Sequence, residues 1–225
     1  MSIAIAIDGP AGAGKSTIAK AAANALGYIY VDTGAMYRAL GLFAIRNGVA
    51  PDDKDAVNEL LKKAEVSLAR NEKKEQLIIL NGEDVSSLIR TEQVSMAASK
   101  ISAIPEVRAF LLSLQRDMAK KNNVIMDGRD IGTVVLPDAK VKIFLTASAE
   151  IRAKRRYDEL VLKGEDVKYE DVLADVIKRD HNDMNREIAP LKPAEDSVIV
   201  DTSDLDLQQS IDLLIKTIEE NIECK

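Results

Sequence analysis

Nine consecutive residues near the N-terminus have the types and spacing of a phosphate-binding loop. The loop pattern G-x-x-x-x-G-K-[ST] is matched in full by Gly9, Pro10, Ala11, Gly12, Ala13, Gly14, Lys15 and Ser16, and Thr17 follows. Glycines let such a loop wrap so that backbone N–H groups point at a β-phosphate, and the following helix adds its positive N-terminal end. The Lys15 ammonium can approach the β and γ oxygens, and the Ser16 hydroxyl can ligate Mg²⁺. We therefore expect residues 9–17 to bind ATP.

A second group of chemically capable residues follows the apolar run 124–126. Asp127, Arg129 and Asp130 come directly after this predicted strand, separated only by Gly128. Asp127 is placed to help hold Mg²⁺ through a water molecule. Arg129 is unusual at such a strand end, because its guanidinium can bind a phosphate with two parallel hydrogen bonds.

Two arginine-rich segments form the third group. Arg152, Arg155 and Arg156 are spaced i, i+3, i+4, while Arg179, Asp183 and Arg186 are spaced i, i+4, i+7. Each set would share one helical face. Such faces are often solvated surfaces with salt bridges, and Glu159 is an available partner. Behind a phosphate loop, however, two such helices joined by a polar break at 163–166 indicate a lid over the γ-phosphate, at about 150–187.

The elements that position these residues alternate between strand and helix. Short apolar runs predict five core strands, at 3–7, 28–31, 124–126, 141–145 and 197–200. Helical segments are predicted at 16–26, 33–47, 53–64, 92–102, 105–121, 150–162, 169–187 and 206–222. This order predicts an α/β fold of the P-loop NTPase type, with a parallel five-stranded sheet and helices on both faces.

The alternation of predicted strands and helices is interrupted between residues 63 and 90. The runs 66–69 and 76–80 leave no room for a crossover helix, so they must pair antiparallel, and Asn81-Gly82 is a strong hairpin signal. The sequence therefore predicts a core domain of residues 1–62 and 91–225, with a small antiparallel insert at 63–90.

Composition excludes several classes of protein. The chain has 225 residues and a net charge of −6, which argues against a general nucleic-acid binder. No apolar run approaches the ~20 residues that a membrane span needs. One cysteine, Cys224, and one histidine, His181, leave no disulfide framework and no histidine or cysteine metal cluster. We expect a cytoplasmic monomer that binds neither nucleic acid nor membrane, with His181 at the surface rather than acting as a base.

Taken together, these stretches resemble the bacterial cytidylate kinases, a family of nucleoside monophosphate kinases. The resemblance covers nearly the whole chain and rests on residues 7–16, 32–38, 127–135 with 137–138, and 179–186. It implies phosphoryl transfer from ATP to CMP or dCMP, with Mg²⁺ as cofactor and the insert as part of the monophosphate-binding region.

The resemblance also implies roles for individual residues. Those expected to hold the phosphate and sugar of the acceptor are Thr33, Tyr37, Arg129, Asp183 and Arg186, and those expected to read its base are Ser99, Arg108 and Asp130. Cytosine offers an N4 amino donor and an N3 acceptor, whereas uracil reverses both. A carboxylate or hydroxyl can accept from N4, and an arginine can donate toward N3 or O2. The wrong base would leave these groups unpaired.

Catalysis would depend on positioning and charge neutralisation, because the acceptor phosphate is already anionic and needs no strong base. Lys15, Arg152, Arg156 and Arg179 are the candidates for stabilising the transferring phosphoryl group. One alternative is a related kinase with another acceptor, such as UMP, AMP or a small hydroxy acid. The other is a P-loop switch that hydrolyses ATP slowly, which the several arginines disfavour.

Overall fold

The structure is a computed structural model that describes residues 2–72 and 76–223. Its contacts separate two compact units. Unit 1 comprises Met1–Tyr30 and Asn122–Lys225, and unit 2 comprises Val31–Lys121. Cys224, the cysteine considered for disulfides, lies outside the described residues.

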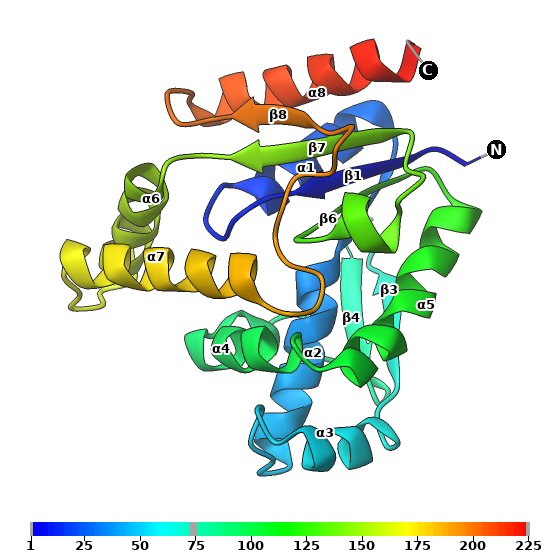
Figure 1. Ribbon diagram of the computed structural model, residues 1–225, viewed down its shortest axis with the longest axis vertical. Helices are drawn as coiled ribbons and strands as arrows, with labels where there is room; N and C mark the ends of the chain where they lie inside the picture. The colour runs from blue at the N-terminus through cyan, green and yellow to red at the C-terminus, as the bar shows by residue number, and fades with distance from the viewer. Residues whose placement is uncertain (1, 73–75, 224–225) are drawn as a thin grey trace. The chain divides into compact units, whose positions relative to one another are not determined.

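Unit 1 is built on a five-stranded sheet in the order β2-β6-β1-β7-β8. Figure 1 labels β6, β1, β7 and β8 of this sheet. Its strands are β1 (Ala4–Asp8), β2 (Ile29–Asp32), β6 (Val124–Gly128), β7 (Val141–Thr146) and β8 (Val198–Asp201). The pairings of β1 with β6, β1 with β7, and β7 with β8 are parallel. The boundary between the units falls within β2. Because β1 pairs with β6 as far as Asp8↔Gly128, the phosphate loop and the 127–130 turn leave the sheet at the same edge.

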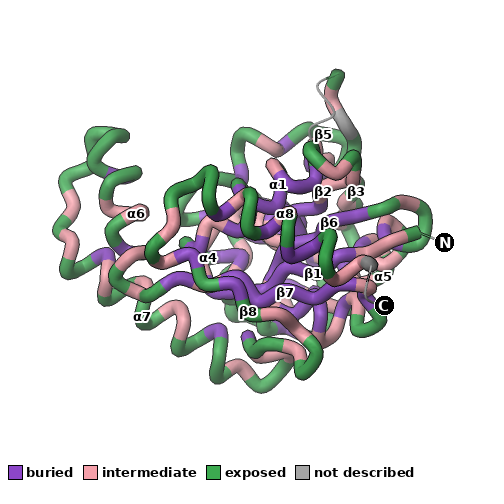
Figure 2. Tube along the Cα trace, turned by 90° about the horizontal axis from the view of Figure 1, so that it is seen from above, coloured by how far each residue is buried: buried purple, intermediate pink, exposed green. Residues whose placement is uncertain are grey.

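The core of unit 1 follows from the wholly apolar strands. Ile5, Ile7 and Ile143 are fully or almost fully buried, and side chains of α1 and α8 pack in the same cluster. The helices of this unit are α1 (Lys15–Leu26), α6 (Ala149–Leu162), α7 (Tyr169–Asn185) and α8 (Leu207–Glu223). In Figure 2 the strands β1 and β7 are almost entirely buried, whereas much of α6 and α7 is exposed. The predicted fold class, a parallel sheet with helices on both sides and a separate antiparallel sheet, is confirmed.

The helix pair α6–α7 has a small apolar core of its own. Ala153, Leu160 and Val172 are buried there, and the rings of Tyr157 and Tyr169 meet edge to face with centroids 6.1 Å apart. Such a separate cluster fits a segment that can move as one body.

Unit 2 combines helices with a three-stranded antiparallel sheet. Its elements are α2 (Thr33–Arg46), α3 (Lys54–Leu61), β3 (Val66–Arg70), β4 (Gln76–Leu80), β5 (Glu83–Asp84), η1 (Leu88–Arg90), α4 (Glu92–Ile101) and α5 (Pro105–Lys121). Between β4 and β5, Asn81 and Gly82 have φ of 49° and 81°, as a type I′ hairpin requires. The antiparallel pairing predicted for 66–69 and 76–80 is confirmed, because β3 pairs with β4 from Val66↔Leu80 to Arg70↔Gln76. The domain division at 63 and 90 remains a prediction.

Two local features differ from the predicted elements. Residues Ile131–Val135 form a π-helical turn, η2, that the run of β-branched residues did not indicate. The helix predicted at 169–187 ends at Asn185, and Arg186 has extended backbone angles. The reason lies in the residues that follow, because Ala189 has φ of 49° and the chain turns back there.

Candidate functional site

The phosphate loop has the backbone that only glycine adopts easily. Gly9, Gly12 and Gly14 have φ of 148°, 76° and 81°. A Cβ on Gly9 would lie 1.9 Å from the carbonyl oxygen of Leu145, so the loop start is packed directly against β7. Helix α1 begins at Lys15, which directs its N-terminal N–H groups into the loop.

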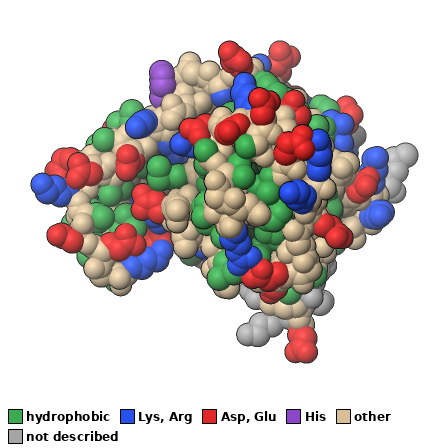
Figure 3. Space-filling view, turned by 90° about the horizontal axis from the view of Figure 1, so that it is seen from below, with side chains coloured by type: hydrophobic (Ala, Val, Ile, Leu, Met, Phe, Trp, Pro, Cys, Tyr) green, Lys and Arg blue, Asp and Glu red, His purple; other side chains and the backbone are tan. Residues whose placement is uncertain are grey.

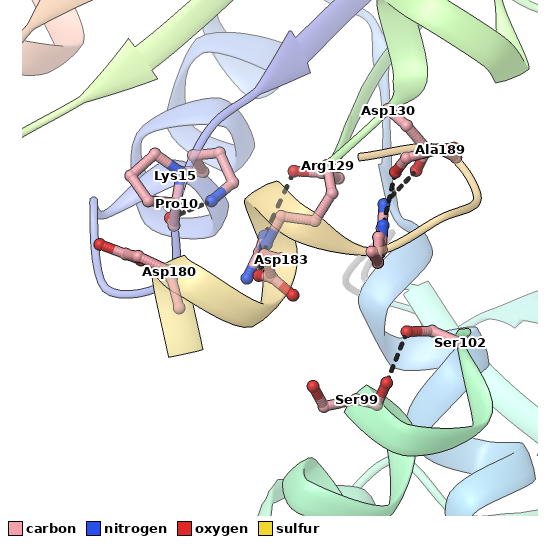
Figure 4. A network of polar contacts seen from close by, with 12 residues as sticks. Pro10, Lys15, Ser99, Ser102, Arg129, Asp130, Asp180, Asp183 and Ala189 are labelled. Atoms are coloured by element: carbon pink, nitrogen blue, oxygen red, sulfur yellow. Dashed lines mark hydrogen bonds and ion pairs between the residues drawn. The ribbon is translucent and has the colours of Figure 1, made fainter. Parts of the chain in front are cut away.

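Lys15 lies inside this loop, with only 6% of its surface exposed. Its Nζ donates to the carbonyl oxygen of Pro10 at 2.6 Å (Figure 4). Burial, and secondly the nearby Arg129 charge, lower the pKa of Lys15 well below its usual value, while Asp127 and Asp8 act in the opposite direction. The ammonium is thus held at the centre of a small network of charges.

A hydroxyl and a carboxylate meet where α1 begins and β6 ends. Ser16 Oγ donates to Asp127 Oδ2 at 2.9 Å, and the phenol of Tyr30 donates to Asp127 Oδ1 at 3.1 Å. Hydroxyl and carboxylate oxygens suit Mg²⁺, which keeps several waters and takes few protein ligands. Within residues 2–72 and 76–223 there is no cluster of three or more His, Cys, Asp or Glu side chains that could hold a metal alone. This donor set fits a metal that is shared with nucleotide phosphates.

The turn after β6 carries two arginine–carboxylate contacts. Arg129 Nε donates to Asp183 Oδ2 of α7 at 2.9 Å, and Arg186 lies 3.5 Å from Asp130 (Figure 4). Asp130 and Asp183 are both buried. All four residues were predicted as acceptor-binding, and the fold of unit 1 brings them together. Because α7 ends at Asn185, Arg186 is placed by the turn and its bond to the Ala189 carbonyl rather than by helical spacing.

The predicted lid arginines have separate environments rather than one shared face. Arg152 is buried and donates to the carbonyl oxygens of Ala147 at 2.8 Å and Ala11 at 3.0 Å. It also forms a two-bond ion pair with Asp180 of α7. Arg156 pairs with Glu159 at 3.0 Å on the surface, as in the salt-bridged alternative.

The other two arginines of these helices point to further neighbours. Arg155 donates to the carbonyl oxygen of Thr202 at 2.8 Å. Arg179 is half-buried on α7, one residue before the partner of Arg152. Arg152 therefore links the phosphate loop, the end of β7 and α7, while Arg156 has none of these contacts among the described hydrogen bonds.

In unit 2, the predicted acceptor residues lie on three helices. Thr33, the first residue of α2, is buried, and Tyr37 lies one turn later. The guanidinium of Arg108 lies 5.9 Å from the centroid of the Tyr37 ring and donates to the Ser102 carbonyl at 3.3 Å. Ser99, on α4, is half-buried, and its carbonyl accepts from the Ser102 hydroxyl. The structure thus brings Tyr37 and Arg108 together.

The α2 start is fixed by two polar groups. Asp32 caps the helix by accepting from the Ala35 N–H at 2.8 Å and also pairs with Arg38. The side-chain oxygen of Gln76, in β4, accepts from the Asp32 N–H at 3.0 Å, and its amide nitrogen approaches the Asp32 carbonyl at 3.4 Å. The antiparallel sheet of unit 2 therefore anchors the backbone just before Thr33.

Three residues of these networks were missed by sequence reasoning. Asp8 is buried and accepts from the backbone N–H groups of Ile131 and Gly132, both at 2.7 Å. Its position next to the phosphate loop was a usable signal. Tyr30 places a hydroxyl inside a strand that is otherwise mostly apolar, which was a weaker signal, and Gln76 had none.

Two further expectations concern the position of His181 and the presence of a membrane-spanning helix. His181 is exposed, and Figure 3 shows this single histidine side chain at the surface. No helix within the described residues combines the length and the apolar character that crossing a membrane would require.

Comparison with known proteins gives one consistent family. The family model described as "Cytidylate kinase" matches residues 5–220. A protein named "Cytidylate kinase" from Caldicellulosiruptor bescii is 51% identical over 224 residues, which are 98% of this chain and 99% of that protein. Another of the same name, from Carboxydothermus hydrogenoformans, is 51% identical over 95% of this chain and 96% of its own length.

Solved structures share the fold at much lower identity. An uncharacterized protein from Eubacterium ventriosum has a TM-score of 0.53 at 15% identity, with 97% of this chain and 99% of that chain covered. A gluconokinase from Sinorhizobium meliloti has a TM-score of 0.51 at 13% identity, with 99% and 94% covered. At such identities the likeness concerns the fold alone.

Proposed function

This chain belongs to the cytidylate kinase family, as its resemblance predicted, and it is a nucleoside monophosphate kinase that phosphorylates CMP and dCMP with ATP; from this premise, we propose how its own residues carry the reaction. One observation supports the proposal most directly. The phosphate loop and the Arg129–Asp130 turn leave neighbouring strands of unit 1, and the Arg129 charge acts on Lys15. A donor-phosphate site and an acceptor-binding arginine therefore belong to one electrostatic network.

The donor triphosphate is bound by residues 9–17. Backbone N–H groups of the glycine-rich loop and the first turn of α1 surround the β-phosphate. Lys15 exchanges its bond with the Pro10 carbonyl for the β and γ oxygens. Since its ammonium is buried and its pKa is lowered, bound phosphate would favour the charged form.

Magnesium ion would be held by Ser16 directly and by Asp127 through water. The 2.9 Å contact between the Ser16 hydroxyl and the Asp127 carboxylate places both oxygens at the loop. When bound, the ion neutralises charge on the β and γ phosphates. Tyr30 orients Asp127 by donating to its other oxygen.

The acceptor, CMP or dCMP, is assigned to the residues that the family resemblance identifies. We assign its phosphate and sugar to Thr33, Tyr37, Arg129, Asp183 and Arg186, and its base to Ser99, Arg108 and Asp130. The buried Asp130 carboxylate suits the N4 amino group of cytosine, which uracil lacks. Arg108 is already oriented by the Tyr37 ring.

In the reaction, an oxygen of the CMP phosphate attacks the γ-phosphorus of ATP, and the bond from that phosphorus to the β–γ bridging oxygen breaks to release ADP. Lys15, Arg156 and Arg179 would stabilise the spread charge directly. Arg152 belongs to the same set, although its bonds to Ala11 and Asp180 indicate that it acts by holding the phosphate loop and α7. Closure of α6–α7 would exclude water and so limit hydrolysis.

ADP formation from Mg-ATP, measured with CMP, dCMP, UMP, AMP or no acceptor, tests these assignments. We expect strong turnover with CMP and dCMP and little with the others. Equal turnover with UMP would remove the base-reading roles of Ser99, Arg108 and Asp130. ADP formation that needs no acceptor would favour a P-loop switch instead. We further propose that the enzyme works in the cytoplasm as a monomer.

A further inference from the structure

The turn that carries Arg129 and Asp130 continues into η2, whose first N–H groups need acceptors from elsewhere. Inside the turn, the N–H groups of Val134 and Val135 donate to the Asp130 carbonyl, and that of Leu136 donates to Ile131. Ile131 and Gly132 stand at the helical start, where backbone N–H groups have no intrahelical partner. Buried N–H groups of this kind require a cap.

The residue in the capping position is Asp130, a type that normally caps helices well. Its side chain makes no capping hydrogen bond, and its carboxylate lies 3.5 Å from Arg186 instead. The cap comes from a residue 123 positions earlier in the chain. Asp8, at the end of β1, accepts from Ile131 with one oxygen and from Gly132 with the other, each at 2.7 Å.

We propose that Asp8 is a positioning residue that caps η2 in place of Asp130, and thereby keeps the Asp130 carboxylate directed at the base of the acceptor. The inference rests on the proposed role of Asp130 in reading cytosine. It adds a residue that touches neither nucleotide but decides how well the enzyme separates CMP from UMP.

The surroundings of Asp8 show that burying its charged carboxylate in this position has a cost in free energy. Asp8 is only 4% exposed, and burial raises the pKa of its carboxyl from 3.8 to about 6, although the two backbone N–H groups act to lower it. The charged groups that affect it are Asp130, which raises the pKa, and Lys15, which lowers it. A neutral asparagine would avoid the burial of charge, but it would not offer a separate acceptor oxygen to each of the two N–H groups.

Asp8→Asn is the direct test. Asp8 uses one oxygen for each N–H group, whereas an asparagine in the same orientation has one oxygen and one amide nitrogen, so one N–H group would face a second donor. Asp130, which occupies the N-cap position of η2, is then the residue expected to supply a replacement cap. We expect kcat/KM for CMP to fall about tenfold and the ratio of CMP to UMP turnover to fall with it, since a misdirected polar group has effects of this size. KM for ATP should stay within about twofold.

A double-mutant cycle separates positioning from a general structural role. Asp130→Asn alone should lower the CMP-to-UMP ratio, and adding Asp8→Asn should then lower it little further, because Asp8 acts through Asp130. Full additivity of the two changes would overturn the inference. So would an equal loss toward ATP and CMP, which would make Asp8 a support of the whole loop. Asp204→Asn, an exposed acid in the same unit, is the matched control and should leave all parameters unchanged.

Gly132→Ala perturbs the donor of the hydrogen bond from the Gly132 N–H to Asp8. This variant provides a second test if Asp8→Asn folds poorly. A Cβ there would lie 3.2 Å from Cδ of Lys142, which is buried and paired with Asp196, and 3.4 Å from Asp8 Oδ2, so these neighbours would have to move by a few tenths of an ångström. We expect the same loss of CMP preference, but smaller. Unchanged CMP-to-UMP ratios in both variants would refute the inference, whereas a wild-type enzyme that does not use CMP would refute the proposed function instead.

Discussion

The two units hold their proposed functional residues by different means. In unit 1, arginines and carboxylates contact each other: Arg129 with Asp183, Arg152 with Asp180, and Arg186 with Asp130. In unit 2, the proposed functional residues are held mainly by hydrogen bonds from side chains to the backbone, which we call backbone anchors. Gln76 binds the main chain of Asp32, and Asp32 caps the helix that begins with Thr33.

This difference predicts different responses to ligand and to mutation. The paired charges of unit 1 are strong but exchangeable, because a phosphate can compete with a carboxylate for the same guanidinium. Removing one partner leaves the other buried and uncompensated. The Gln76 anchor of unit 2 is a neutral amide contact, and we expect its loss to shift the backbone by a small amount. Substitutions in unit 1 should therefore have larger effects than those in unit 2.

The largest effect is expected for Arg152→Ala. It removes bonds to Ala147, Ala11 and Asp180 at once and leaves Asp180, whose side chain is 14% exposed, without its ion pair. We expect the free energy of unfolding to fall by about 3 kcal/mol and kcat to fall about 100-fold, measured by urea unfolding and by ADP release.

Arg156→Ala, one turn away on the same helix, is the matched control. Arg156 is paired at the surface with Glu159, so the free energy of unfolding should change by less than about 0.5 kcal/mol. A fall in kcat without loss of stability would support its direct role at the phosphates. Equal stability of both variants would show that the Arg152 contacts do not hold unit 1 together.

The next largest effect concerns pH and Asp8. Because its pKa in the folded protein is about 6 and its ordinary value is 3.8, the neutral form favours folding. The neutral Asp8 carboxyl therefore adds its full contribution to the free energy of unfolding below about pH 4. This contribution is lost as the pH rises to about 6. Relative to Asp8→Asn, the free energy of unfolding of the wild type should thus fall by roughly 2–3 kcal/mol over this window. Parallel curves for the two proteins would contradict the raised pKa.

A smaller effect is expected for Asp183→Asn, which keeps the shape but removes the charge opposite Arg129. The ion pair at 2.9 Å becomes a hydrogen bond from the charged Arg129 to a neutral amide oxygen, so Arg129 loses a charged partner and the proposed contact with the acceptor sugar would weaken. We expect kcat/KM for CMP to fall about tenfold in steady-state assays. Asp175→Asn, exposed on the same helix, should have no effect. Unchanged kinetics for Asp183→Asn would argue against its acceptor role.

Local patterns were enough to predict most of the fold. The phosphate loop lay between a strand and a helix as its spacing required, and Asn81-Gly82 formed the predicted hairpin turn. Element ends were less accurate, because the end of α7 depends on the turn at Ala189 rather than on residues within the helix.

Partners of the site residues could not be predicted in the same way. Asp8 and Ile131 are 123 positions apart, and Asp32 and Gln76 are 44 apart. Such bonds depend on which strands become neighbours, and they leave no periodic pattern in either segment. Motifs therefore indicated the residues proposed to contact ligand, while the residues that hold them were found only from the structure.

The smallest effect, and the sharpest test of the comparison, is expected in unit 2 for Gln76→Ala. This change removes the acceptor for the Asp32 N–H, so the start of α2 and the residues Thr33 and Tyr37 lose one anchor. We expect KM for CMP to rise about three- to fivefold, kcat to stay nearly constant, and the free energy of unfolding to fall by about 1 kcal/mol. Gln93→Ala, exposed on α4 of the same unit, controls for loss of a surface amide. If Gln76→Ala lowered kcat as strongly as Arg152→Ala, the contrast between exchangeable charges in unit 1 and backbone anchors in unit 2 would not hold, since an amide contact would then control the chemical step itself.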